Sequence, residues 1–237
     1  MRWHVYSGGT EKIIEASGVY GVVQIPEKIP TMYASIDLCE VLRQTRATLR
    51  TVEEVSPGVV DRKLGYAEGL SVCNDVVPVV QTLMANGLVP PVDDLDKIVP
   101  IMQGWKRSGV YIFANTSTLP GCEIPTIDFL EEYLPGIFSG ILLPRNHDGT
   151  LPATKGTVAR DLLEYLGAAG GSIPATAIHI DDLSHHTEDF RRHVGGLPNV
   201  RVETFQPVYP YFSADPGSVI SQTPLQAFEQ ADRFLFS

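Results

Sequence analysis

Acidic, hydroxyl and lysine side chains stand at the borders of apolar segments along this 237-residue chain, where they could do chemistry together. Asp37 follows the apolar run TMYASI, and Asp181 and Asp182 follow AIHI. Three carboxylates at one place repel one another unless a cation lies between them, and Mg²⁺ prefers such oxygen ligands. Lysine and hydroxyl groups beside it would suit a phosphoryl group. The further candidates are Lys155, which opens a predicted helix, and Asn115, Thr116 and Ser117, which follow VYIFA.

Alternating strands and helices are expected to bring these side chains to one edge of a sheet. From residue 110 onward, apolar runs of strand length alternate with segments of helical periodicity, as in parallel βαβ units. Runs such as VYIFA are apolar throughout, which is typical of strands buried on both faces. We therefore predict an α/β fold with a doubly wound, Rossmann-like parallel sheet. In such a sheet, ligands bind at the carboxyl ends of the strands.

The chain divides by pattern into a core, an extension and an insertion. Residues 1–30 form a β-rich N-terminal extension, with strands expected near 3–6 and 19–25. Residues 31–56 and 96–237 form the core. Residues 57–95 are predicted to form a small helical cap insertion.

Composition and charge exclude several classes of function. The net charge of −10, without a cluster of Lys and Arg, argues against a nucleic-acid partner. The three cysteines show no C-x-x-C spacing, and no apolar run approaches the length of about 18 residues that a membrane span needs. We expect a cytoplasmic globular protein that binds neither membrane nor nucleic acid.

Four motifs, in order, resemble those of the haloacid dehalogenase superfamily of aspartate-nucleophile phosphohydrolases. The first, Asp-x-Asp-x-Thr/Val-Leu after an apolar strand, is similar to DLCEVL at 37–42. The second, a strand ending in Ser or Thr, is similar to VYIFANTST. The third, a lysine opening a helix, is similar to Lys155, and the fourth, a strand ending in two acids, to the Asp181 and Asp182 pair. The resemblance covers about residues 31–205.

The resemblance implies Mg²⁺-dependent hydrolysis of a small phosphorylated metabolite through an aspartyl-phosphate on Asp37. The phosphoryl oxygens would be bound by Lys155 and by the hydroxyl of Thr116 or Ser117, in the segment that begins at Asn115. The Mg²⁺ ligands would be the carboxylate of Asp37, the backbone carbonyl of Cys39, and Asp181 or Asp182.

Two positions depart from the family pattern. Cys39 stands where the family has its second Asp, the general acid, and loss of a positioned acid typically costs ~10²–10⁴ in rate. Substrates whose leaving group departs unaided, such as acyl or aryl phosphates, would then be favoured. Ala114 occupies one possible position of the second-motif hydroxyl, so that Thr116 or Ser117 must supply it. A catalytically silent binding or regulatory module is the alternative function, and the oligomeric state is left open.

Each candidate also has a purely structural interpretation. Asp37 could cap the following helix, and Asp181 and Asp182 could cap the segment LSHHTEDF. Lys155 could be a surface lysine. Thr116 could satisfy a turn, and Cys39 could be a small buried hydrophobic residue. His185 and His186 point about 100° apart on a helix, which favours a solvated or core role over a metal pair. Lys63 could act as a Schiff-base electrophile in a phosphonate-cleaving variant of the fold.

Overall fold

A computed structural model describes most of the predicted core. The described residues are 11–16, 19–44, 48, 82–117, 122–144, 154–168, 174–209 and 213–237. Most of the predicted cap at 57–95, with Lys63, lies outside them, so the cap remains a prediction. The strand expected at residues 3–6 also lies outside.

An eight-stranded sheet organises the described residues, in the order β1-β2-β5-β4-β3-β6-β7-β8. The strands from β5 to β8 in this order are parallel, and the hairpin β1–β2 extends the sheet antiparallel to β5. The strands are β1 (Glu11–Ala16), β2 (Val19–Gln24), β3 (Met32–Ile36), β4 (Tyr111–Asn115), β5 (Gly140–Pro144), β6 (Ala175–Ile180), β7 (Val200–Pro207) and β8 (Val219–Ser221).

Strand β3 lies at the topological switch point of the sheet. The chain proceeds from β3 to β4 and β5 on one side, and then crosses to β6, β7 and β8 on the other. Because β4 and β6 both pair in parallel with β3, the carboxyl ends of these three strands meet at one edge. Ligands of doubly wound sheets bind at this position.

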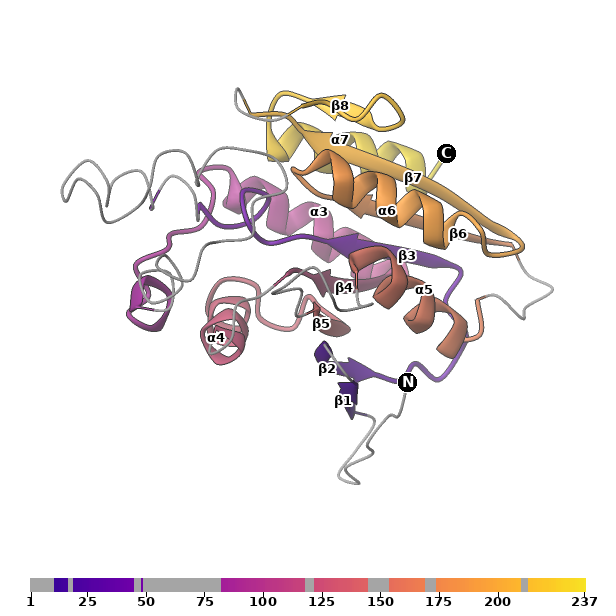
Figure 1. The fold of residues 1–237 in the computed structure, drawn as a ribbon, viewed down its shortest axis with the longest axis horizontal. Coiled ribbons are helices and arrows are strands. Elements are labelled where there is room, and N and C mark those ends of the chain that lie inside the picture. Colours follow the sequence, from indigo (N-terminus) through magenta and orange to yellow (C-terminus); the bar gives the residue numbers. More distant parts are fainter. Residues whose placement is uncertain are drawn as a thin grey trace.

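Helices cover both faces of the sheet (Figure 1). Ala34 and Ile36 of β3 join the core packed under α3, α4 and α7, whereas Tyr33 joins the core under α5 and α6. Successive side chains of a strand point to opposite faces, which explains why β3 is apolar throughout. The helices are α3 (Leu95–Arg107), α4 (Glu123–Tyr133), α5 (Lys155–Tyr165), α6 (Ser184–Val194) and α7 (Pro224–Leu235).

The doubly wound α/β fold predicted from sequence is confirmed. Each alternating segment predicted after residue 110 forms its strand or helix, displaced at most by a few residues. Two strands went unpredicted: β1, whose side chains EKIIEA mix charged and apolar types, and β8, which has only three residues. β1 lacks the continuous apolar run of the central strands, and β8 is too short for periodicity to identify. In the described part of the chain, no helix combines the length and apolarity needed to cross a bilayer.

Candidate active site

The site forms where β3, β4 and β6 end. Asp37 directly follows β3, and its backbone N–H donates to the carbonyl of Ile180, the last residue of β6, at 2.9 Å. Asp181 directly follows β6, and Asn115 is the last residue of β4. The parallel register therefore places the two carboxylates side by side, although 144 residues separate them along the chain.

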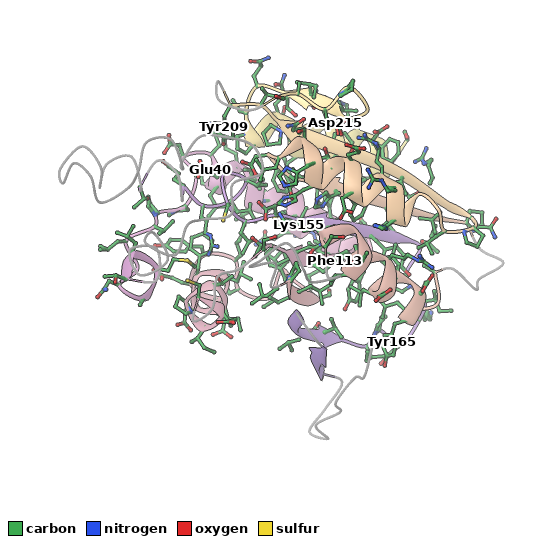
Figure 2. The ribbon with its side chains drawn as sticks, in the orientation of Figure 1. Glu40, Phe113, Lys155, Tyr165, Tyr209 and Asp215 are labelled. Carbon is green, nitrogen blue, oxygen red and sulfur yellow. The ribbon has the colours of Figure 1, made fainter. Side chains whose placement is uncertain are left out.

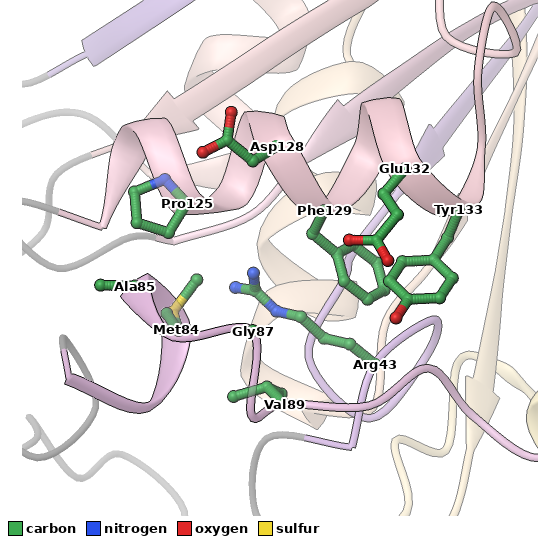
Figure 3. Close-up of a pocket in the computed structure, with 10 residues that line it drawn as sticks. All are labelled: Arg43, Met84, Ala85, Gly87, Val89, Pro125, Asp128, Phe129, Glu132 and Tyr133. Carbon is green, nitrogen blue, oxygen red and sulfur yellow. The ribbon is translucent and has the colours of Figure 1, made fainter.

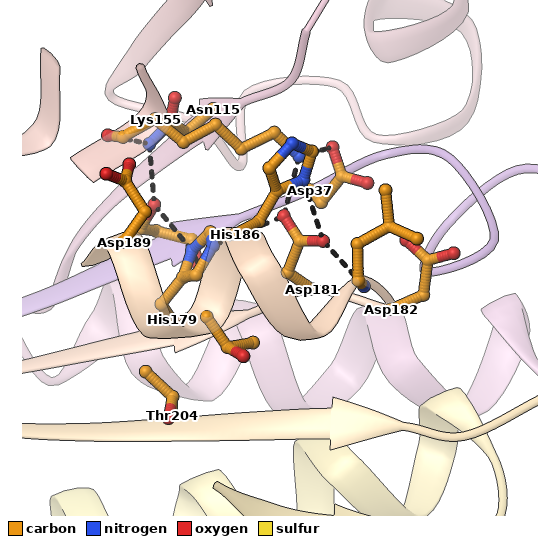
Figure 4. A network of polar contacts seen from close by, with 12 residues as sticks. Asp37, Asn115, Lys155, His179, Asp181, Asp182, His186, Asp189 and Thr204 are labelled. Carbon is orange, nitrogen blue, oxygen red and sulfur yellow. Dashed lines mark hydrogen bonds and ion pairs between the residues drawn. The ribbon is translucent and has the colours of Figure 1, made fainter. Parts of the chain in front are cut away.

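Lys155 lies between these two carboxylates (Figure 4). Its Nζ is 2.7 Å from Asp37 Oδ1 and 2.6 Å from Asp181 Oδ2. The lysine is only 2 % exposed, near the middle of the molecule (Figure 2), so the alternative that it is a surface lysine is wrong. Burial by itself would lower the pKa of Lys155, but the charges of Asp181 and Asp37 raise it above its ordinary value.

The position of Lys155 is unfavourable for a structural lysine. It is the first residue of α5, and the N-terminus of a helix repels a cation. The turn is fixed independently by Thr154, which caps the helix, and by Gly156, whose N–H donates to Asp189 Oδ2 at 2.7 Å. A Cβ on Gly156 would lie 2.4 Å from the Asp189 carbonyl oxygen, so a larger residue would displace α5 from α6. These contacts direct the lysine toward the carboxylates.

Two histidines that sequence reasoning did not assign to the site contact Asp181. His179 Nε2 lies 3.2 Å from Asp181 Oδ2, and its ring stacks on Phe190 with 4.5 Å between ring centroids. His186 Nδ1 lies 3.2 Å from Asp181 Oδ1. Burial would raise the pKa of Asp181, but Lys155 and His186 hold it well below its usual range. His186 is thus half-buried against Asp181, a contact that sequence reasoning did not predict.

Asp37, Asp181 and Asp182 form a compact group of carboxylates. One oxygen from each lies within 4.8 Å of the others, and each residue is at most 3 % exposed. Lys155 offsets only part of this buried negative charge. The donor set therefore fits a hard divalent cation such as Mg²⁺, which takes carboxylate ligands. The cap alternatives are wrong, because no helix lies within residues 37–44 and helix α6 has Leu183 at its N-cap position without a side-chain cap hydrogen bond. Asp181 Oδ1 accepts the N–H of Leu183 at 3.0 Å in the turn before that helix.

Asn115 connects the elements around the site. Its Nδ2 donates to Ser35 Oγ at 3.2 Å and to the carbonyl of Lys155 at 3.0 Å, and it is fully buried. Ser35 Oγ in turn lies 3.0 Å from His179 Nδ1. Asn115 thus joins β4, β3 and α5, and its position favours an orienting role over direct contact with solvent-borne substrate. Sequence reasoning missed Ser35 because serine within an apolar strand gives no signal of its partners.

The two hydroxyl candidates have different surroundings. Thr116 is 1 % exposed, and its hydroxyl has no hydrogen-bond partner among the described residues. Ser117 is exposed. A buried hydroxyl without a partner is costly, which makes Thr116 the better candidate for binding a ligand oxygen.

The segment after Asp37 forms a tight turn. The carbonyl of Leu38 accepts the N–H groups of both Leu42 and Arg43 at 2.9 Å, and Glu40 adopts a positive φ of 58°. The hydroxyl of Tyr209 donates to the Glu40 carbonyl. Cys39 lies in this turn, and its Sγ accepts a weak hydrogen bond from Arg43 Nη2 at 3.5 Å. Residue 39 is therefore held beside a guanidinium.

The comparisons with known proteins give structural neighbours but no sequence relatives. No family model matches the sequence, and no curated protein matches it. One solved structure with a similar course is a candidate β-phosphoglucomutase from Bacteroides vulgatus, with 12% identity, a TM-score of 0.47, and coverage of 87% of this chain and 89% of that one. Another is a haloacid dehalogenase-like family hydrolase from Xanthomonas campestris, with 12% identity, a TM-score of 0.49, and coverage of 90% and 96%. At this level of similarity, the functional argument rests on the site itself.

Proposed function

We propose that this protein is a Mg²⁺-dependent phosphohydrolase of the haloacid dehalogenase type, acting on a small phosphorylated metabolite. The observation that carries the proposal is the placement of Lys155 between Asp37 and Asp181, at the switch point of the sheet. A buried ammonium and a cluster of carboxylates together provide a nucleophile, a cation site and a positive charge for a phosphoryl group.

Asp37 is the proposed nucleophile. One of its carboxylate oxygens bonds to phosphorus while the bond from phosphorus to the leaving-group oxygen breaks, and that oxygen keeps the electron pair. Water then attacks the aspartyl-phosphate, which releases inorganic phosphate and regenerates the carboxylate. Mg²⁺, held by Asp37, the Cys39 carbonyl and Asp181 or Asp182, would neutralise charge on the phosphoryl oxygens.

The other residues bind and orient. Lys155 neutralises charge on the phosphoryl group, and the Thr116 hydroxyl donates to one of its oxygens. Asn115 holds the backbone of Lys155 in place through the 3.0 Å bond to its carbonyl. His179 and His186 orient Asp181 by contacts to its two different oxygens.

Cys39 restricts the proposed substrates. A thiol is a poor replacement for a carboxylic acid as proton donor to a leaving alkoxide. Acyl and aryl phosphates release a leaving group that needs no proton in the transition state. We therefore expect these compounds to be hydrolysed faster than alkyl phosphates. Cys39 in place of the second Asp also favours the second candidate function, a catalytically silent module that binds phosphorylated ligands.

Trapping the aspartyl-phosphate separates the two functions. The protein is incubated with 4-nitrophenyl phosphate or acetyl phosphate and Mg²⁺, then quenched with borohydride, which reduces an acyl phosphate at Asp37 to homoserine. Mass spectrometry of the peptide containing residue 37 should find homoserine in the wild type and none in Asp37→Asn. The matched control Asp96→Asn, an exposed acid outside the site, should be trapped like the wild type. Absence of both turnover and homoserine in the wild type would leave the silent module as the function.

A further inference from the structure

Arg43 is a buried guanidinium without an acidic partner. It is 2 % exposed, and no carboxylate of the described residues lies within 4.0 Å of it. Its hydrogen bonds are long and go to a hydroxyl and a sulfur atom: Nη1 to Thr126 Oγ1 at 3.3 Å and Nη2 to Cys39 Sγ at 3.5 Å. Its Nε has no partner in the described structure. The charge is therefore desolvated with little compensation.

An uncompensated buried charge needs an explanation, because the ordinary way to bury arginine is to pair it with a carboxylate. The ring of Phe129 lies under the guanidinium, but at 5.9 Å to the centroid it gives only weak attraction. Burial raises the pKa of the nearby Cys122 thiol to about 11, so this group does not supply the missing negative charge at neutral pH. An anion from outside the protein would supply this negative charge.

A cavity opens beside this guanidinium. It has a volume of about 210 Å³ and lies between α4 and the segment around residues 84–89. The side chain of Arg43 extends into this space, opposite Phe129 and Met84 (Figure 3). The lining is amphipathic and is completed by Gly87, Val89 and the ring of Tyr133. The cavity thus combines apolar side chains and the carboxylates of Asp128 and Glu132 with one guanidinium that can donate paired hydrogen bonds.

Arg43, which lines the cavity, also contacts the turn that follows Asp37. The guanidinium contacts the side chain of Cys39, which stands two residues after Asp37. Two residues span at most about 7 Å of backbone. The turn that begins at Asp37 therefore also carries Cys39, which the guanidinium contacts, and this proximity is the geometric link between the two places.

We propose that Arg43 binds a second anionic group, a carboxylate or phosphate, on the non-transferred part of the substrate. This inference rests on the proposed function, since it places the phosphoryl group at Asp37. A guanidinium fork matches two oxygens of such a group, and the exchange of water for this anion restores neutrality to the buried charge. Asp128 and Glu132 also line the cavity, but both are exposed, so water and salt screen them more than they screen Arg43.

Paired non-hydrolysable ligands test this proposal. Titration calorimetry in Mg²⁺ compares propylphosphonate, which has one anionic group, with phosphonoacetate, 3-phosphonopropionate and 4-phosphonobutyrate, which add a carboxylate at increasing reach. Alkylene bisphosphonates of matching length, which carry a second free phosphonate in place of the carboxylate, distinguish phosphate-like from carboxylate recognition. We expect at least one two-anion ligand to bind the wild type about tenfold or more tightly than propylphosphonate.

The ratio of the affinity for the best two-anion ligand to the affinity for propylphosphonate shows whether Arg43 binds the second anion. In Arg43→Gln and Arg43→Met the ratio should fall close to one, whereas the exposed control Arg192→Gln should keep the wild-type ratio. A ratio near one in the wild type for every spacer, or a high ratio that persists in both Arg43 variants, would overturn the inference while leaving the proposed function in place. Failure of the wild type to bind any phosphonate would instead count against the proposed function and, with it, this use of Arg43.

Thermal melting provides a readout that does not depend on ligand. Because the guanidinium has no acidic partner to lose, Arg43→Met, which keeps the apolar stem, should melt at or above the wild-type temperature. A marked fall in melting temperature for both Arg43 variants would show that the arginine serves the packing of α4 and would contradict the inference.

Discussion

Lys155 Nζ lies 2.6 Å from Asp181 Oδ2, joining the start of helix α5 to the end of strand β6 in a buried ion pair. The same ammonium reaches Asp37, so one lysine compensates carboxylates from two strands. The ion pairs do not by themselves make the site stable, because desolvation of three charged groups opposes their attraction. In the proposed function, these ion pairs fix where the phosphoryl group and the cation bind.

Removing the lysine should destabilise the fold. In Lys155→Met, two buried carboxylates lose their cation, and we expect a loss of about 3–5 kcal/mol in the free energy of unfolding. Urea denaturation followed by circular dichroism measures this loss. Lys97→Met is the matched control, since Lys97 pairs with Asp94 on the exposed surface of α3 and its removal should change little. Equal stability of the two variants would contradict the buried ion pairs.

Asp182 should be needed for divalent cation binding. Millimolar Mg²⁺ is expected to raise the melting temperature of the wild type, because a ligand that binds only the folded state stabilises it. Asp182→Asn should reduce or abolish this rise, with Asp181→Asn as its companion and the exposed Asp96→Asn as control. An unchanged rise in both site variants would place the cation elsewhere.

Cys39→Asp should change rates according to the leaving group. Restoring a carboxylic acid should speed alkyl phosphates more than aryl phosphates, because only an alkoxide needs a proton in the transition state. The gain should remain below the ~10²–10⁴ typical of a general acid, since the Arg43 guanidinium next to position 39 stabilises the ionised carboxylate. Adding Arg43→Met should increase the gain for alkyl substrates.

The kcat/KM values for both substrate types, with Asp37→Asn as the blank, measure this effect. Equal acceleration of alkyl and aryl phosphates would show that residue 39 is not the position of the missing acid.

Acid should lower the free energy of unfolding because Asp215, near the C-terminal end of the sheet, becomes protonated. Burial would raise the pKa of Asp215, but hydrogen bonds from Arg191, Thr187 and Ser218 hold it well below its ordinary value. A depressed carboxyl pKa stabilises the fold above the unfolded pKa, and this stabilisation is lost as pH falls below about 4.

Asp215→Asn should therefore cost about 2 kcal/mol or more at pH 7 and flatten the fall of stability between pH 4 and pH 2. Urea midpoints across this range test the expectation, with the exposed Asp96→Asn as control. An acid profile identical to that of the wild type would exclude Asp215 as the titrating group.

The sequence by itself determined which residues end the central strands. Runs such as VYIFA and AIHI are largely apolar, which is typical of strands buried on both faces, and the polar residue after each run is expected at the carboxyl edge of the sheet. Asp37 and Asp181 follow from this rule alone. The lysine at 155 was identifiable by its place at a helix start, but its two partners were not.

Only the tertiary structure decided which of these groups meet. The contact of Lys155 with both carboxylates depends on β6 pairing with β3 and on the packing of α5 against α6, and neither is encoded in local spacing. The choice of Thr116 over Ser117 likewise depends on the surroundings of the β4 end, which bury the first and expose the second. The isolation of Arg43 from acidic partners has the same origin. Local pattern fixes the face on which a side chain lies, whereas its charge partners come from segments that only the folded chain brings together.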